Sequence, residues 1–362
     1  NDTYSASTFL ALRNIHRALM NANMEEQVKV TVPLNADALS ASGTPSNSVF
    51  REDITHNMLE IVGFLAENQC PFTLNIYPFL ALGDNKSLPL DYAFFDSHAS
   101  PITDGQYTYF NMFDATYDAL IMALTKVGYS NMSILVGGIG WPTDGDANAT
   151  PDNALRFNQG FLDHVSSNVG TPRHPNTPID FYLSSLIDED IRSISTGGFE
   201  RHWGMLRYDG VPKYTLSLSV SWKSKRRALV SVPGVRYLDK KWCVLNTDVV
   251  DTSTLPDSIS YACMNADCTP LGFGCSCYPY LDDVGNASYA FNAYFQRQNQ
   301  EMGSCSFDGL GRIVTVDPSI NTSCPFMVQI AYGSSSTTKV KVRHVQVLVG
   351  LCPLLVFIMV LL

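Results

Sequence analysis

The sequence has few basic side chains. Its 24 Lys and Arg stand against 34 Asp and Glu, so the formal net charge is −10 at pH 7. A negatively charged protein repels polyphosphate, which argues against nucleic acid as a partner. The one basic run, from Lys223 to Arg227, lies among Ser and Val between two better-patterned regions, and this position favours a solvated linker.

Cysteine is nearly absent from the first two thirds of the chain. Before residue 243 there is only Cys70, whereas seven of the nine cysteines lie between Cys243 and Cys324. Such clustering in a short segment predicts a disulfide framework formed in an oxidising compartment. The alternative is a zinc site, which the lack of a regular C-x2-C pair disfavours. It would use the most closely spaced cysteines, Cys263, Cys268, Cys275 and Cys277.

A secretory route is also indicated by Asn-x-Ser/Thr triplets, the acceptors of N-linked glycans. The candidate glycosylation sites are Asn85, Asn131, Asn148, Asn286 and Asn321. The chain has no initiating Met and no charged start followed by an apolar stretch, so the signal peptide that this route requires is missing. We therefore expect the sequence to be N-terminally truncated.

Long apolar runs are absent except at the end of the chain, where residues 345–362 are almost wholly apolar. A polar spacer precedes this run, and small residues precede the spacer within an anchor region of residues 331–344. Small residues, polar spacer and apolar tail are the order of a glycolipid-anchor signal, which predicts a protein on the outer face of the plasma membrane or in the cell wall. The alternative is a membrane span, but no polar segment follows the run. Candidate anchor sites are Gly333, Ser334, Ser335 and Ser336.

The first 235 residues alternate between apolar runs of strand length and segments with helical spacing. The predicted strands cover residues 28–35, 72–80, 133–141 and 179–186. This alternation predicts an α/β fold with buried parallel strands. If the fold is a (β/α)8 barrel, only about four of its eight units are present, so the first strands are expected to be missing.

Several long motifs in this region resemble glycoside hydrolase family 17, the plant endo-β-1,3-glucanases. The resemblance covers residues 1–221 and is carried by TFLALRNIHRAL, VKVTVPLNAD, FTLNIYPFLAL, GWPTDGD, RFNQGF, and IDEDIRS followed by FERHWG. It implies the C-terminal part of a TIM barrel and hydrolysis of β-1,3-glucan with retention through two glutamates. No cofactor and no metal are implied.

The resemblance implies that neither catalytic glutamate is intact. The family nucleophile sits two residues before Gly-Trp-Pro, and here that position is Gly138. The family acid/base lies in a Gly-Asn-Glu motif upstream of the segment that Asn1 begins, so it falls outside this sequence. Since glycine cannot form a glycosyl-enzyme bond, we expect this chain to be inactive.

Other positions of the family cleft are present at the expected strand ends. Polar and aromatic side chains at these strand ends suit a carbohydrate site. The alternative for Trp141 is a place in the hydrophobic core, and the alternative for the acidic residues 188–190 is a solvated loop. Replacement of the nucleophile by one of the glutamates is disfavoured, because a shift of about 1 Å already costs about two orders of magnitude in rate. The substrate-binding candidates are Asn35, Tyr77, Phe79, Trp141, Glu189 and Glu200.

The last part of the chain resembles the plant six-cysteine callose-binding module, carbohydrate-binding module family 43. Residues 222–239 are interpreted as the linker, and residues 240–330 as the module, which contains the signature SYAFNAYFQ. Six cysteines permit 15 pairings, which sequence alone does not resolve. The candidates are Cys243, Cys263, Cys268, Cys277, Cys305 and Cys324, while the states of Cys70 and Cys275 are open.

Together these features predict a glucan endo-1,3-β-D-glucosidase family member whose partner is callose, a β-1,3-glucan of the cell wall. One hypothesis is an endo-acting hydrolase held at the membrane by its lipid. The other is a non-catalytic protein that binds or tethers glucan, and Gly138 favours this second hypothesis.

Overall fold

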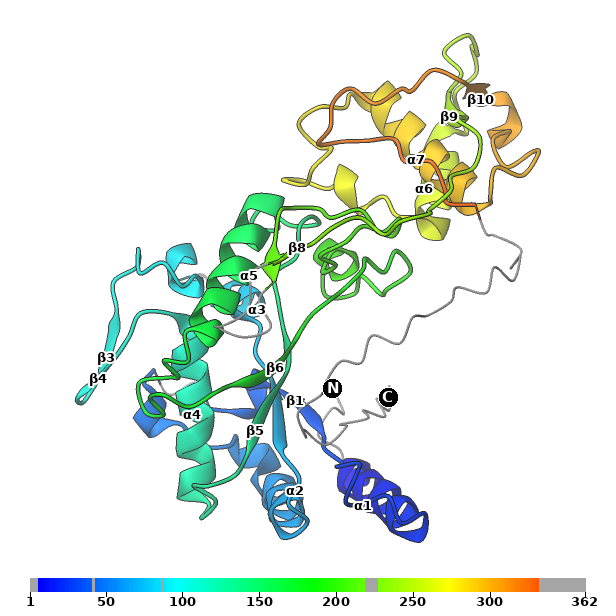
Figure 1. Cartoon of the computed structure of the whole chain (residues 1–362). Helices are drawn as coiled ribbons and strands as arrows, with labels where there is room; N and C mark the ends of the chain where they lie inside the picture. Colours follow the sequence, from blue (N-terminus) through cyan, green and yellow to red (C-terminus); the bar gives the residue numbers. More distant parts are fainter. Residues whose placement is uncertain (1–5, 41–42, 86, 219–226, 332–362) are drawn as a thin grey trace.

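The computed structural model describes residues 6–40, 43–85, 87–218 and 227–331. In Figure 1 the helices and the parallel sheet of the first part occupy the lower left, and a smaller module lies at the upper right. No helix among the described residues is long and apolar enough to cross a bilayer. The predicted anchor sites and apolar tail lie outside the described residues, as does most of the basic run.

A four-stranded parallel sheet forms the centre of the first part in the described ranges. Its strand order is β1-β2-β5-β6, and the central register aligns Leu34, Leu74, Val136 and Phe181. The predicted α/β architecture is confirmed, with strands shorter than expected. Their bounds are β1 (Pro33–Asn35), β2 (Phe72–Asn75), β5 (Ile134–Ile139) and β6 (Asp180–Leu183).

Helices pack against this sheet and bury an apolar core. Two of them begin where their sequence provides a cap: Asn111 accepts a hydrogen bond from the Asp114 amide at 2.8 Å, and Thr150 accepts one from Asn153 at 3.2 Å. Such caps satisfy backbone donors that the first helical turn leaves unpaired. The helices are α1 (Ala6–Asn21), α2 (Thr55–Glu67), α3 (Pro78–Asp84), α4 (Met112–Lys126) and α5 (Pro151–Ser166).

Short elements connect these units. Two antiparallel pairs, β3 (Ile102–Asp104) with β4 (Tyr107–Tyr109) and β7 (Ser217–Leu218) with β8 (Arg227–Ala228), lie outside the parallel sheet. The 3-10 turns are η2 (Ala36–Ala38), η3 (Pro45–Asn47), η4 (Glu52–Ile54), η5 (Leu90–Ala93), η6 (Gly198–Arg201), η7 (Thr269–Leu271) and η8 (Phe307–Gly309).

The module is built from two helices and a two-stranded sheet. Strand β9 (Trp242–Leu245) pairs antiparallel with β10 (Gly311–Val314), and α7 (Asp283–Arg297) packs on β9 and on α6 (Leu255–Asn265). All six predicted cysteines are crosslinked, so the zinc alternative is wrong. The disulfides are Cys243–Cys305, Cys263–Cys268 and Cys277–Cys324, while Cys70 and Cys275 are buried thiols.

The chain enters and leaves the module side by side. Leu238 N donates to Gln329 O at 2.8 Å, and Ala331 N donates to Arg236 O at 2.7 Å. Tyr237 and Ile330 form the antiparallel bridge between these two bonds. The described part of the predicted linker, from Arg227 onward, is thus hydrogen-bonded at its far end to the strand that leaves the module.

Candidate functional site

The ends of β2 and β5 bring three candidate residues together. Asn75 is in register with Gly138, and its side-chain amide donates to Asn35 Oδ1 at the end of β1, at 3.0 Å. Tyr77 lies two residues after the end of β2. These side chains lie at the C-terminal edge of the parallel strands, which is where barrel enzymes place their chemistry.

Gly138 is buried in this edge, and the phenol of Tyr77 occupies the space in front of it. A β-carbon added at Gly138 would lie 2.2 Å from Tyr77 Oη and 3.0 Å from its Cζ. Contacts between a β-carbon and another heavy atom essentially never fall below about 3.0 Å, so any side chain here requires Tyr77 to move. The position therefore offers neither a nucleophile nor room for one while Tyr77 keeps its place.

Tyr77 is itself held by its surroundings. Its ring meets the Trp203 ring edge-on at a centroid distance of 4.9 Å. Burial raises the pKa of Tyr77 above its ordinary value, against the opposing effects of a hydrogen bond with Ser184 and the nearby Arg192 charge. The phenol is thus a neutral hydrogen-bonding group at neutral pH.

The two glutamate candidates meet at one arginine. Arg192 Nε lies 3.0 Å from Glu200 Oε2, and Arg192 Nη1 lies 3.2 Å from Glu189 Oε2. Thr196 also donates to Glu200 Oε1 at 2.8 Å. The Glu200 side chain is 13% exposed and that of Glu189 is 56% exposed. The two carboxylates therefore share one cation, so the group keeps a net negative charge, and their substrate-binding roles stay predictions.

Trp141 differs from the sequence expectation. Its side chain is fully buried, its ring packs against Phe94 and Phe157, and its Nε1 donates to Asn148 O at 3.0 Å. An indole without an exposed face cannot stack on a sugar, so the core alternative describes it. Phe79 lies in the same aromatic cluster and is only 6% exposed.

Sequence reasoning missed Trp203 as a neighbour of the site. It lies in the FERHWG motif that the family resemblance used, and its ring contacts Tyr77 and Phe79. Its Nε1 is buried without a hydrogen-bond partner among the described residues. The sequence signal that could have identified Trp203 was its position as an aromatic residue in the FERHWG motif.

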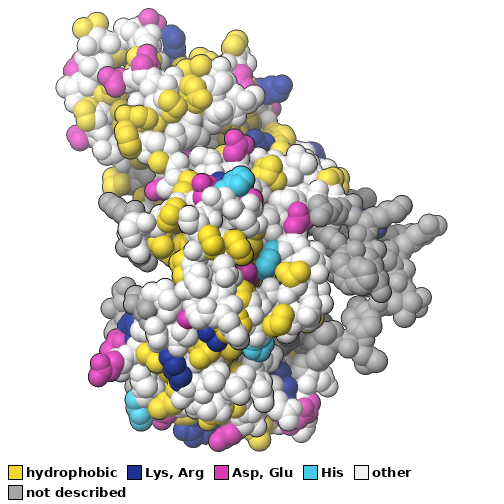
Figure 2. All heavy atoms as spheres, turned by 90° about the vertical axis from the view of Figure 1, so that its left-hand side faces the viewer, with side chains coloured by type: hydrophobic (Ala, Val, Ile, Leu, Met, Phe, Trp, Pro, Cys, Tyr) yellow, Lys and Arg dark blue, Asp and Glu magenta, His cyan; other side chains and the backbone are white. Residues whose placement is uncertain are grey.

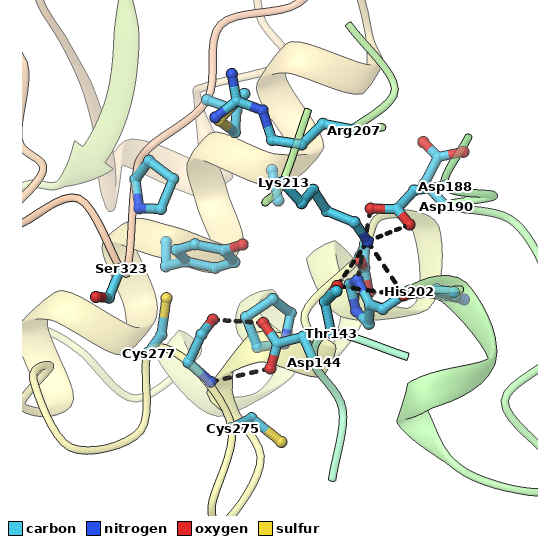
Figure 3. A pocket seen from close by; sticks show the side chains of 18 of the residues that line it. Thr143, Asp144, Asp188, Asp190, His202, Arg207, Lys213, Cys275, Cys277 and Ser323 are labelled. Atoms are coloured by element: carbon cyan, nitrogen blue, oxygen red, sulfur yellow. Dashed lines mark hydrogen bonds and ion pairs between the residues drawn. The ribbon is translucent and has the colours of Figure 1, made fainter. Parts of the chain in front are cut away.

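A cavity of about 630 Å³ lies between the barrel part and the module (Figure 3). Its barrel wall includes Thr143, Asp188 and Lys213, and its module wall includes residues of α7 and of the 274–280 loop. Lys213 Nζ lies 2.6 Å from both Asp188 Oδ1 and Thr143 Oγ1, and 3.1 Å from His202 O. No motif in the sequence indicated this cavity, because residues far apart in the chain form it.

Polar contacts hold the two walls of this cavity together. Asp144 accepts hydrogen bonds from the amide and the hydroxyl of Ser276. Arg201 Nη1 lies 3.1 Å from Asp267 Oδ1, and His202 Nε2 lies 2.6 Å from Thr269 Oγ1. The module is therefore docked on the loops that follow β5 and β6.

Family models match both parts of the chain. Residues 2–218 match the model of glycosyl hydrolases family 17, and residues 241–312 match the X8 domain. The chain is 48% identical over 333 residues to glucan endo-1,3-beta-glucosidase 5 of Arabidopsis thaliana, covering 91% of this chain and 67% of that protein. It is 46% identical over 340 residues to glucan endo-1,3-beta-glucosidase 8 of the same plant, covering 93% and 69%.

Solved structures give the same result. The fold resembles CJP38, a beta-1,3-glucanase and allergen of Cryptomeria japonica pollen, with a TM-score of 0.56 and 33% identity over 59% of this chain and 66% of that one. It also resembles one of two plant beta-glucan endohydrolases with distinct substrate specificities, with a TM-score of 0.52 and 33% identity. The match covers 57% of this chain and 65% of that one. The chain spans about two thirds of the length of these relatives.

These likenesses confirm the predicted fold class, part of a TIM-type (β/α)8 barrel followed by a small disulfide-rich module. The family 17 model covers more than half of the chain, and a relative 48% identical aligns with nine tenths of it. The chain therefore belongs to glycosyl hydrolases family 17 and carries an X8 domain after its barrel part.

Proposed function

We propose that this chain binds β-1,3-glucan without hydrolysing it. The observation that carries the proposal is Gly138, a residue with no side chain at the position where the family resemblance places the nucleophile. A retaining glycosidase needs a carboxylate there to attack the anomeric carbon. The Tyr77 hydroxyl occupies the space that a β-carbon at this position would need, so a side chain fits at residue 138 only if Tyr77 moves.

The choice of glucan as ligand is supported by the relatives, two of which are named glucan endo-1,3-beta-glucosidases. The module also presents aromatic rings to solvent: Phe273 is 82% exposed, Tyr278 is 49% exposed, and their centroids lie 5.1 Å apart. Exposed rings of this kind offer stacking faces to sugars. Figure 2 shows hydrophobic side chains spread over the visible face of the module, in the upper part of the view.

The test combines two assays on the purified chain. One measures reducing ends released from a soluble β-1,3-glucan such as laminarin, and the other measures retention on an insoluble β-1,3-glucan. We expect retention without release. Turnover above the blank would overturn the loss of hydrolysis, and failure to be retained would overturn glucan binding. A covalent sugar adduct after treatment with a mechanism-based fluoroglycoside would also contradict the proposal.

We also propose that the chain is held at the outer face of the plasma membrane by a glycolipid. The support is the order of small residues, polar spacer and apolar tail in residues 331–362. Phosphatidylinositol-specific phospholipase C should release the protein from the surface of expressing cells. Retention after this treatment, with release by detergent only, would favour a membrane span.

Glycosylation is proposed first at the exposed acceptors. Asn85, Asn131 and Asn148 are exposed. Asn286 is partly buried in α7, and the hydroxyl of Ser288, the third residue of its triplet, donates to Val284 O at 2.7 Å. Peptide mapping after glycan removal should find the three exposed sites occupied. Occupancy at Asn286 alone would contradict this order.

A further inference from the structure

The cavity between the barrel part and the module has the size of a ligand site. Its volume of about 630 Å³ falls within the range of about 300 to 1,000 Å³ found for small-molecule pockets. Neither Gly138 nor Tyr77 lines it, so it is separate from the edge of the sheet where the family resemblance places the chemistry. Both parts of the chain contribute walls, as Figure 3 shows for Lys213 and Asp188 opposite Cys277 and Ser323.

Charged side chains that face this cavity already have ion-pair or hydrogen-bond partners. Lys213 contacts Asp188 at 2.6 Å, Arg207 contacts Asp209 at 2.9 Å, and Asp144 accepts two hydrogen bonds from Ser276. A charged ligand would have to displace one of these partners and leave a buried charge uncompensated, which is costly. The cavity is therefore suited to a neutral ligand that forms hydrogen bonds.

Aromatic and proline side chains supply the remaining walls. Tyr208, Tyr280 and Tyr289 line the cavity together with Pro270, Pro279 and Pro325. Tyrosine combines a flat apolar face with a hydroxyl, so one side chain both stacks on a sugar ring and bonds its hydroxyl groups. Tyr280 is 46% exposed and is thus accessible to a ligand from solvent.

The loop that forms the module wall also leads out of the cavity. Residues 274–277, 279 and 280 line it, while Phe273 and Tyr278 of the same loop are exposed and pack edge-on against each other. Aromatic side chains of this loop thus lie both in the cavity wall and on the outer surface of the module. A linear polymer fits such a path better than a compact metabolite does.

We propose that this cavity binds a short stretch of β-1,3-glucan, so that the barrel part and the module share one glucan site. The inference rests on the proposed function, because the choice of β-1,3-glucan as the neutral polyhydroxylated ligand comes from it. It goes further in placing a binding site between the two parts, where either part alone would provide only one wall.

Laminaripentaose, a chain of five β-1,3-linked glucoses, is the probe, and its dissociation constant is measured by titration calorimetry with the whole chain. Tyr280→Ala removes a wall of the cavity, and Ala293→Trp fills it from α7. Tyr261→Ala is the matched control, because it is a tyrosine of the module with 49% exposure that does not line the cavity. Near-ultraviolet circular dichroism and melting temperature establish that each variant is folded.

We expect both cavity variants to weaken laminaripentaose binding by about tenfold or more, which corresponds to about 1.4 kcal/mol, and the control to weaken it less. Wild-type affinity in both cavity variants would overturn the shared site, whatever the control does. If the wild-type chain binds neither laminaripentaose nor insoluble β-1,3-glucan, the proposed function itself fails. If the cavity variants bind laminaripentaose as the wild type does and are retained on insoluble glucan, the chain binds glucan at another site.

Discussion

Glycine at position 138 and tyrosine at position 77 depend on each other. The tyrosine hydroxyl takes the place that a β-carbon at 138 would need, and the tyrosine ring packs edge-on against Trp203. A carboxylate cannot be restored at 138 by one substitution without moving a packed ring. Residues 138 and 77 are thus coupled through their packing.

Gly138→Ala should lower the free energy of unfolding by about 1 to 3 kcal/mol, because it overpacks a filled site. Tyr77→Phe in the same chain should recover part of the loss, since it removes the closest atom. Urea unfolding of the two single variants and the double variant measures this coupling. Gly83→Ala is the control, since a β-carbon there would meet nothing within 4 Å. Equal stability of Gly138→Ala and wild type would show that the site has room after all.

Lys213 is the buried cation of the cavity wall, and its role is structural in the absence of a ligand. Burial lowers the pKa of Lys213 and raises that of Asp188, while their mutual attraction opposes both shifts. Lys213→Met should cost about 3 to 5 kcal/mol, because it removes the cation that contacts the buried Asp188 carboxylate and leaves it only the Gly204 amide and the more distant His202. Adding Asp188→Asn should recover part of this. Chemical unfolding is the measurement, and a double variant no better than Lys213→Met would contradict the pairing.

At the scale of elements, Arg156 joins α5 to the segment around η5. Its guanidinium lies 2.5 Å from Asp96 and 2.8 Å from Asp91, and it stacks over the Phe94 ring at 3.9 Å. The hydrogen bond from Arg156 holds the pKa of Asp96 below its ordinary value of 3.8. A carboxyl group whose pKa is lower in the folded protein stabilises the fold at pH values above its pKa in the unfolded chain. This stabilisation is lost as the pH falls through the pKa in the folded protein.

Arg156→Met should therefore reduce the stability at neutral pH by about 1 kcal/mol and flatten its decline between about pH 5 and pH 2. Unfolding by urea at a series of pH values tests both effects. Arg17→Met, which changes an exposed arginine of α1, should leave the pH dependence as in the wild type. A parallel decline in wild type and Arg156→Met would exclude the pair as its source.

The three disulfides should differ in their effect on the module. Cys243–Cys305 spans 62 residues, whereas Cys263–Cys268 spans 5. Loop-closure entropy predicts a loss of about 4 kcal/mol for the alanine pair at the first bridge and about 2 kcal/mol at the second. Guanidinium unfolding of the two double variants gives the comparison. The reverse order would show that native packing, and not the denatured chain, controls the difference.

The sequence predicts the elements of the core well and their ends poorly. Its four strands were recognisable because parallel strands are apolar over their length. The strand predicted for residues 72–80 ends at Asn75, because Pro78 begins α3. The β3–β4 hairpin was missed although Asp104-Gly105 is a turn signal and Gly105 has a φ of +63°.

Only those parts of the candidate site that lie within a single sequence motif could be predicted. The position of Gly138 and the choice of six cysteines both came from the family resemblances. Trp141 was misplaced because an aromatic ring at a strand end has the same sequence signature whether it faces the cleft or the core. The cavity and its pair Lys213 and Asp188 were not predictable, since tertiary packing brings their segments together.

At the scale of the whole molecule, a few ion pairs and hydrogen bonds fix the module on the barrel part. Arg201→Glu and Asp267→Arg should each loosen this docking by placing like charges opposite each other, and the double variant should restore it. Small-angle X-ray scattering should give a larger radius of gyration for each single variant and the wild-type value for the double. An unchanged radius in the single variants would show that other contacts suffice.

The adjacent entry and exit strands of the module determine how it would carry a mechanical load. A pull between the barrel part and the chain beyond residue 331 acts across the pair formed by residues 236–238 and 329–331. Because the two strands are antiparallel and are pulled from the same end, their backbone hydrogen bonds would break one after another. The crosslinked interior of the module would bear little of this force until the pair has parted, so the pair would be the first part of the module to yield under tension.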